Sequence, residues 1–244
     1  MVTLLVGLAL ANPSHEAIDG ASWQEVTRRS HADAGEVVVY RATVAGIDCF
    51  RGTAAVDVPA EKMLDVVADV EGAVRWSSAG VTDAKLLSQA ANGIDYYQYL
   101  DVPGWTMASD RFWFLHGTLQ KGPESWSLRW TRLIDGGDHS EEWKKLKEDH
   151  SSAIEPPVNV GSWVFAPNEG STQMTYSVCT QPGGSIPVGG PSTRTWACLT
   201  RSFRSLRSTT RTVPTTGAPS AVRSFASRIN RWARSSNCRP PDSR

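Results

Sequence analysis

Residues 109–133, SDRFWFLHGTLQKGPESWSLRWTRL, contain two apolar and aromatic runs that are separated by a short polar turn. The turn, Lys121-Gly122-Pro123, joins 109–119 to 124–133, and this pattern predicts a β-hairpin. Similar strand-like runs with turn signals between them occur on both sides of this stretch, at 81–89, 93–100, 160–166 and 172–180. Six successive strands predict an antiparallel meander, and one face of such a sheet must be buried against another layer.

The residues before the meander predict a second hairpin and then a helix. The runs 36–45 and 48–57 are β-rich and flank a turn at 46–48. Pro59 suits the first turn of a helix, and apolar residues then recur at helical spacing, at Met63, Val66, Val67 and Val70. We expect two further short helices, one beginning at 22–26 and one at 140–149. The second lies in a charged excursion, 135–159, which we expect at the edge of the sheet.

Charge divides the 244-residue chain into two parts, although the formal net charge is zero. Residues 1–190 hold 14 Lys and Arg against 24 Asp and Glu, whereas residues 191–244 hold 11 Arg and a single acid, Asp242. The later part also lacks Lys and has 18 Ser or Thr. A domain boundary near residue 190 is therefore the clearest organisational signal, and the 40% hydrophobic content predicts a sizeable core before it.

The region after residue 190 begins with a helix-like pattern. Trp196, Leu199, Phe203 and Leu206 recur at a spacing of three or four residues, which predicts a closing helix over 194–211. We therefore expect an α+β fold, in which a curved antiparallel sheet wraps around a long C-terminal helix and leaves a hydrophobic tunnel. The domain would span 20–212.

The Arg/Ser-rich tail, 213–244, has a composition typical of disorder. Phe225, Ile229 and Trp232 lie on one face of a short basic segment, so transient contact with an anionic membrane surface is a further hypothesis, and no specific nucleic acid is expected. A third interpretation is that the sequence after Pro187 comes from a shifted reading frame, because a sequence with many Arg and no Lys is typical of a GC-rich gene that is read out of frame. Translation of the other two frames tests it.

The N-terminal segment, 1–19, starts with an apolar run from Val2 to Ala11 that ends in a small-x-small pattern. Such a run is compatible with a signal peptide, in which case the chain is exported to the periplasm or the outside. The alternative is an apolar start that folds onto the core of a cytoplasmic protein. The four cysteines have neither metal-ligand spacing nor the density of a disulfide framework, and Cys49 and Cys179 are most simply small buried residues.

Short patches stand in a fixed order between about Trp23 and Pro187. They are 35–41 (GEVVVYR), 50–52 (FRG) with 56–60 (VDVPA), 69–71 (DVE) ahead of Trp76, 109–111 (SDR), Trp163 before 175–176 (TY), and 181–187 (QPGGSIP). In this ordered set the chain resembles the START lipid-transfer domains, of bacterial type, within the superfamily of helix-grip ligand-binding folds. Bacterial members often carry a signal peptide just ahead of the first tryptophan.

This resemblance implies a domain that binds or transfers one lipid, sterol or similar molecule in a tunnel, without a cofactor or catalytic machinery. Two departures from the family pattern stand out. Phe112 follows Ser109-Asp110-Arg111, where many relatives have an acidic residue. The Arg-rich sequence after Pro187 stands where relatives have a closing helix rich in Leu, Ala and Asn.

Aromatic residues on the predicted strands are the candidate walls of a ligand site, because a pocket for an apolar molecule needs such walls and few polar anchors. Arg111 is the candidate anchor, since it alternates with Trp113 and Leu115 on one side of its strand, and an arginine can hold a head group or pair with a nearby acid such as Asp110. The other candidate ligand-binding residues are Tyr97, Tyr99, Trp105, Trp130, Trp163, Phe165, Trp196, Leu199 and Phe203.

Catalytic signatures give no candidate nucleophile or metal site, since the sequence has no GxSxG, HExxH, CxxC or P-loop motif. His139 and His150 flank the charged helix, which is best explained as a solvated face. The sequence therefore predicts a binding protein rather than an enzyme. The alternative is a polyketide cyclase-like enzyme of the same superfamily, in which Arg111, Tyr97 or His116 would act as acids or orienting groups.

Overall fold

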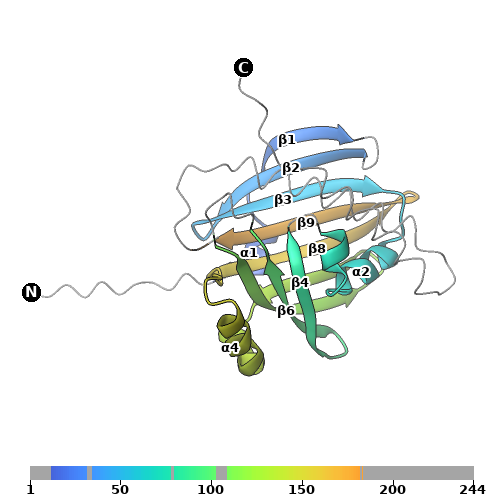
Figure 1. Cartoon of the computed structure of the whole chain (residues 1–244). Helices are drawn as coiled ribbons and strands as arrows, with labels where there is room; N and C mark the ends of the chain where they lie inside the picture. The colour runs from blue at the N-terminus through green and yellow to red at the C-terminus, as the bar shows by residue number, and fades with distance from the viewer. Residues whose placement is uncertain (1–11, 32–34, 78–79, 103–108, 182, 184–244) are drawn as a thin grey trace, which may run out of the picture.

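The computed structural model describes residues 12–31, 35–77, 80–102, 109–181 and 183. Its main feature is one large, curved antiparallel sheet with few helices, as Figure 1 shows. The predicted α+β class is confirmed. The predicted closing helix, 194–211, and the apolar segment before residue 12 lie outside the described residues, as does the tail, 213–244.

The sheet has nine strands in the described part of the chain, in the order β1-β2-β3-β9-β8-β7-β6-β5-β4. The strands are β1 (Gln24–His31), β2 (Gly35–Val44), β3 (Ile47–Val56), β4 (Val81–Gln89), β5 (Gly93–Leu100), β6 (Arg111–Lys121), β7 (Trp126–Arg132), β8 (Val158–Asn168) and β9 (Ser171–Gln181). The predicted hairpin and the predicted six-strand meander are both confirmed. The last strand of the meander, β9, pairs with β3 and so joins the two units.

The predicted helix at 22–26 is wrong, because the chain from Gln24 onward forms β1 at the edge of the sheet. The sequence of β1 has no apolar periodicity that would hold a helix against the core. It pairs instead with β2, and Arg28 makes an ion pair with Glu36 across the two strands. The ladder of backbone hydrogen bonds therefore decides its structure.

Helix α2 (Ala60–Ala68) covers one face of the sheet, here called the inner face, and packs against β7 and β8 (Figure 1). Its buried side chains include Met63, Leu64 and Val67, and burial of each contributes about 1.5–3 kcal/mol. The short helix α3 (Ala73–Trp76) follows and leads into β4. The helix predicted after Pro59 is thus confirmed, although it ends at Ala68, before Val70.

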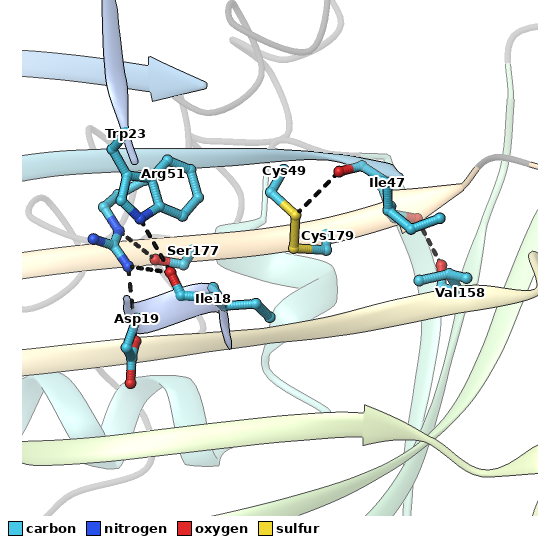
Figure 2. The surroundings of a disulfide bond; sticks show 10 residues. Ile18, Asp19, Trp23, Ile47, Cys49, Arg51, Val158, Ser177 and Cys179 are labelled. Atoms are coloured by element: carbon cyan, nitrogen blue, oxygen red, sulfur yellow. Dashed lines mark hydrogen bonds and ion pairs between the residues drawn. A yellow bond between two sulfur atoms is a disulfide. The ribbon is translucent and has the colours of Figure 1, made fainter. Parts of the chain in front are cut away.

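The opposite face, here called the outer face, carries α1 (His15–Asp19) and a disulfide between Cys49 of β3 and Cys179 of β9. Both cysteines are buried, as predicted, but the interpretation as simple small residues is wrong. The register places them directly opposite each other, with 4.1 Å between their Cα atoms. Figure 2 shows the bond beside the contacts that hold α1 in place.

Arg51 makes most of those contacts on the outer face (Figure 2). Its guanidinium lies 4.2 Å from the centre of a ring of Trp23 and donates to Ser177 Oγ and to the carbonyl of Ile18. Burial lowers the pKa of Arg51, while the nearby Asp19 carboxylate acts in the other direction. This arginine therefore ties α1 to the strands on either side of the disulfide.

The charged excursion contains the 3₁₀ segment η2 (Ile134–His139) and α4 (Ser140–Asp149), so the predicted helix is confirmed. The expected position of the excursion at the edge of the sheet is wrong. Leu146 of α4 packs on the outer face against Phe112 and Phe114 of β6, the third strand from the edge. In the described part of the chain, no helix is long and apolar enough to cross a membrane.

Candidate functional site

A cavity of about 270 Å³ lies between the inner face of the sheet and the segment from α2 to β4. This volume is close to the lower end of the range of small-molecule pockets, roughly 300–1,000 Å³. Its walls come from α2, α3 and the segments beside them, and from strands β4 to β9. The lining residues are Val67, Val70, Trp76, Ser77, Val81, Tyr96, Gln98, Leu100, Trp113, Leu115, Leu128, Trp130, Asn159, Trp163, Tyr176, Val178 and Thr180.

Aromatic rings make up much of this lining. Trp163 of β8 is central, because its ring centre lies 4.3 Å from that of Tyr176 and 6.5 Å from that of Trp76, which meets it edge-on at 79°. Tyr176 also lies 5.8 Å from the ring centre of Trp130. Tilted and edge-on pairs of this kind contribute about 0.5–1.5 kcal/mol each beyond the area they bury. The rings therefore form a packed, ordered wall.

Two glycines leave room for side chains of the cavity wall. A methyl group at Gly117 of β6 would lie 2.9 Å from Cδ1 of Leu128 and 3.0 Å from Cγ1 of Ile94, which is closer than normal contact, and 3.4 Å from Cε1 of Tyr96, which is ordinary contact. A methyl group at Gly161 of β8 would overlap Cζ2 of Trp130 and the carbonyl oxygen of Ser177. Side chains at these two positions would displace the cavity walls.

The polar groups of the lining are uncharged. The indole of Trp130 donates to Oδ1 of Asn159 at 2.9 Å, and the Thr180 hydroxyl donates to the carbonyl of Val158. Burial raises the pKa of Tyr96, as does the nearby Tyr176, and burial also raises the pKa of Tyr176. Both phenols therefore stay protonated. Among the described residues, no Asp, Glu, Lys, Arg or His lines the cavity.

The candidate tryptophans of β6, β7 and β8 come together as expected on the inner face, where Trp113, Trp130 and Trp163 line the cavity. Phe165 belongs to the same buried cluster and stacks on Trp163, with 6.2 Å between ring centres, so it packs beside the wall on the same face. The other candidates on this list lie outside the described residues: Trp105, Trp196, Leu199 and Phe203.

Tyr97 and Tyr99 lie on the outer face and do not reach the cavity. The Tyr97 hydroxyl donates to Asp83, and the Tyr99 hydroxyl donates to Asp110 at 2.6 Å. The physical reason is the two-residue alternation of β5, which directs Tyr96 and Gln98 inward and the odd-numbered tyrosines outward. The expectation that these two rings form the wall of a tunnel is corrected accordingly.

Arg111 shares the side of β6 that carries Trp113 and Leu115, as expected, but it lies beyond the end of the cavity lining. Its buried guanidinium donates to the carbonyls of Ser109, Asp110 and Gly183. The Asp110 carboxylate accepts hydrogen bonds from the Tyr99 hydroxyl and the Val102 amide. Arg111 therefore joins the start of β6 to the segment after β9.

Three aromatic residues of the site are missing from the candidates above, namely Trp76, Tyr96 and Tyr176. Trp76 and Tyr176 both belong to the patches that carry the family resemblance, which is the signal that points to them. Tyr96 stands beside Tyr97 in β5, and the local sequence does not distinguish their faces.

The groups named for the enzyme alternative do not meet. His116 and Tyr97 lie on the outer face, where Nδ1 of His116 is 2.6 Å from Oδ1 of Asp95, and Arg111 lies at the start of β6. His139 also contacts Asp95, at 3.0 Å, and His150 packs on the Tyr99 ring. Within the described residues, no group of three or more His, Cys, Asp or Glu is arranged to hold a metal ion.

Solved structures similar to this chain include STAR-related lipid transfer proteins. The chain is similar to a STAR-related lipid transfer protein of Xanthomonas axonopodis, with a TM-score of 0.62 and 21% identity, over 78% of this chain and 98% of that one. It is also similar to human StAR-related lipid transfer protein 5, with a TM-score of 0.64 and 16% identity, over 79% and 88% of the two chains. The chain therefore has the START-type helix-grip fold.

Sequence comparison gives a relative in Pseudomonas aeruginosa. It is an uncharacterized protein that is 28% identical over 158 residues, which cover 64% of this chain and 72% of that protein. No family model matches the chain.

Proposed function

We propose that this protein binds a hydrophobic small molecule, such as a lipid or sterol, in the cavity on the inner face and releases it unchanged. The observation that carries the proposal is the lining itself, in which four tryptophans and two tyrosines surround about 270 Å³ beneath α2. An apolar molecule that enters this cavity loses contact with water, and each buried CH₂ group contributes about 0.8 kcal/mol.

The chemistry of the lining supports binding without turnover. General acid or base catalysis needs a group whose pKa lies near the working pH. The two phenols of the cavity have pKa values raised by burial, and the other described polar groups of the lining are amides, hydroxyls and indoles. Such groups orient a ligand through neutral hydrogen bonds. The cyclase-like alternative predicts that an offered polyketone changes mass, and mass spectrometry of the recovered compound distinguishes the two.

Membrane contact through the basic tail, 213–244, belongs to the same proposal, since a lipid carrier meets its ligand at a membrane. The supporting observation is the excess of Arg after residue 190. Cosedimentation with anionic vesicles would fall steeply with salt if this contact exists.

Native mass spectrometry of the full chain tests the binding proposal. The protein is measured as purified and again after incubation with mixed lipids and sterols, and any bound compound is extracted and identified. We expect a one-to-one adduct. A folded protein that stays empty against the whole panel would refute the proposal.

A pair of variants shows where the adduct binds. Leu100→Trp adds volume inside the cavity and is expected to reduce the adduct, whereas Tyr97→Trp adds volume on the outer face and is expected to leave it unchanged. An equal effect of both substitutions would contradict the inner-face site.

A further inference from the structure

Tyr96 and Tyr176 approach each other from opposite sides of the cavity. Tyr96 starts on β5 and Tyr176 on β9, and β7 lies midway between these strands in the sheet. The Tyr96 ring passes Gly117 at the place where the Leu128 side chain of β7 also lies, while the Tyr176 ring contacts Trp130 of β7. Both rings therefore reach side chains of β7 from opposite directions, and the phenols are near enough for Tyr176 to help raise the pKa of Tyr96.

The two hydroxyl groups are available to a ligand. Neither hydroxyl is hydrogen-bonded to another described residue. Both oxygens also keep contact with open space, unlike Nε1 of Trp76 and of Trp113, which are buried without a hydrogen-bond partner. Both tyrosines line the cavity and neither oxygen is sealed, so a ligand in the cavity can reach them. Each hydroxyl can donate one hydrogen bond and accept others.

The surroundings of this pair disfavour a charge. A buried ion needs an opposite charge or several hydrogen bonds, because the loss of its hydration otherwise opposes binding. The described lining near the phenols consists of indoles, aliphatic side chains and the neutral polar groups of Ser77, Gln98, Asn159 and Thr180. An alcohol or a carbonyl group finds donors and acceptors here, whereas a carboxylate, phosphate or ammonium group finds no counter-ion among the described residues.

We propose that Tyr96 and Tyr176 form a subsite for one uncharged oxygen group, so that the ligand is a neutral amphiphile with an apolar body and a buried hydroxyl or carbonyl. This inference rests on the proposed function, because it specifies which head group the same cavity accepts. It assigns the apolar body to the tryptophan wall and the oxygen group to the space between the two phenols.

Four compounds with the same apolar body test the subsite by titration calorimetry on the full chain at pH 7. They are naphthalene, 2-naphthalenemethanol, 2-naphthoate and 2-naphthylmethylammonium. An apolar cavity of about 150 Å³ holds benzene, so a cavity of about 270 Å³ has room for this bicyclic body. We expect the alcohol to bind about fivefold more tightly than naphthalene, through one net neutral hydrogen bond, and both ions to bind at least about tenfold more weakly than the alcohol.

Conservative variants assign the preference to the two hydroxyls. In the double variant Tyr96→Phe/Tyr176→Phe, we expect the advantage of the alcohol over naphthalene to vanish while naphthalene affinity stays within about twofold. Tyr97→Phe is the matched control, because it removes a hydroxyl from the adjacent residue on the outer face and should leave all four affinities unchanged.

The outcomes separate the inference from the proposed function. If naphthalene binds but the alcohol has no advantage, or if the double variant keeps that advantage, the subsite is wrong and the apolar cavity stands. Tighter binding of the carboxylate or the ammonium ion than of the alcohol would also overturn the subsite. If none of the four compounds binds to the folded protein, both the subsite and the apolar cavity are refuted.

Discussion

The inner and outer faces of the same sheet differ in what their side chains do. On the inner face, strands β5 to β9 contribute rings around a cavity with no charged residue in its described lining. On the outer face, the same strands carry an ion pair from Arg129 to Asp19, one end of the disulfide and the contacts that hold α1 and α4. Because successive side chains of a strand point to opposite faces, one stretch of sequence encodes a binding surface and a structural surface together.

The comparison predicts that damage to the outer face lowers stability and spares binding. The disulfide closes a loop between positions that are 130 residues apart, and for a loop of that length the loss of chain entropy corresponds to about 4–5 kcal/mol. We expect Cys49→Ala/Cys179→Ala to lose about this much free energy of unfolding, measured by urea denaturation. At urea concentrations below the unfolding midpoint of the variant, its ligand affinity should equal that of the wild type. Added reductant should not destabilise the variant further, and a loss below about 1 kcal/mol would contradict the prediction.

The disulfide also bears on the location of the protein. Structural disulfides form and persist in oxidising compartments such as the periplasm. The bond between Cys49 and Cys179 is therefore expected to form in such a compartment.

A substitution on the inner face should affect stability and binding together. In Gly161→Ala, the added methyl group overlaps the Trp130 ring and the backbone oxygen of Ser177, so the cavity wall has to shift. We expect a loss of about 1–3 kcal/mol in the free energy of unfolding and weaker ligand binding. Gly122→Ala is the control, since its methyl group comes no closer than 3.5 Å to another atom. Unchanged binding in Gly161→Ala would break the link between ring position and affinity.

The smallest expected effect is a change in the stability of the protein at low pH, which comes from Asp110 at the end of the outer face. Hydrogen bonds from the Tyr99 hydroxyl and then the Val102 amide lower the pKa of Asp110. A carboxylate with a lowered pKa stabilises the fold above its unfolded pKa, about 3.9, and this contribution is lost as the pH falls through the folded value. The difference in unfolding free energy between the wild type and Asp110→Asn should therefore shrink below about pH 4. Tyr99→Phe should reproduce part of this change, and a difference that stays constant with pH would contradict the assignment.

The strands of the meander and of the β2–β3 hairpin, with the pairing inside each unit, were predictable because their signals are local. Turns such as Lys121-Gly122-Pro123 separate the runs, and the observed bounds of β4 and β5 coincide with the predicted ones. The helix after Pro59 was predictable for the same reason. The edge strand β1 was not, because its structure depends on β2 rather than on its own pattern.

The faces of β5 and β6 were harder to predict because both faces are covered. Phe112 and Phe114 pack outward against α4, while Trp113 and Leu115 point inward, so apolar residues do not alternate with polar ones. The choice between Tyr96 and Tyr97 requires knowledge of the register and of the helix on the outer face. The disulfide, likewise, depends on the pairing of β3 with β9, which no local pattern indicates.

The pairing of β3 with β9 also determines the order in which the sheet can be completed. During synthesis, β1, β2 and β3 emerge first, and each strand from β5 to β9 then finds its preceding neighbour as it appears. The free edge of β3, however, remains unpaired until β9 has been made, and such an edge is prone to pair with other chains. Oxidation of Cys49 must follow this late step, and it then prevents the final strand from separating from the first hairpin.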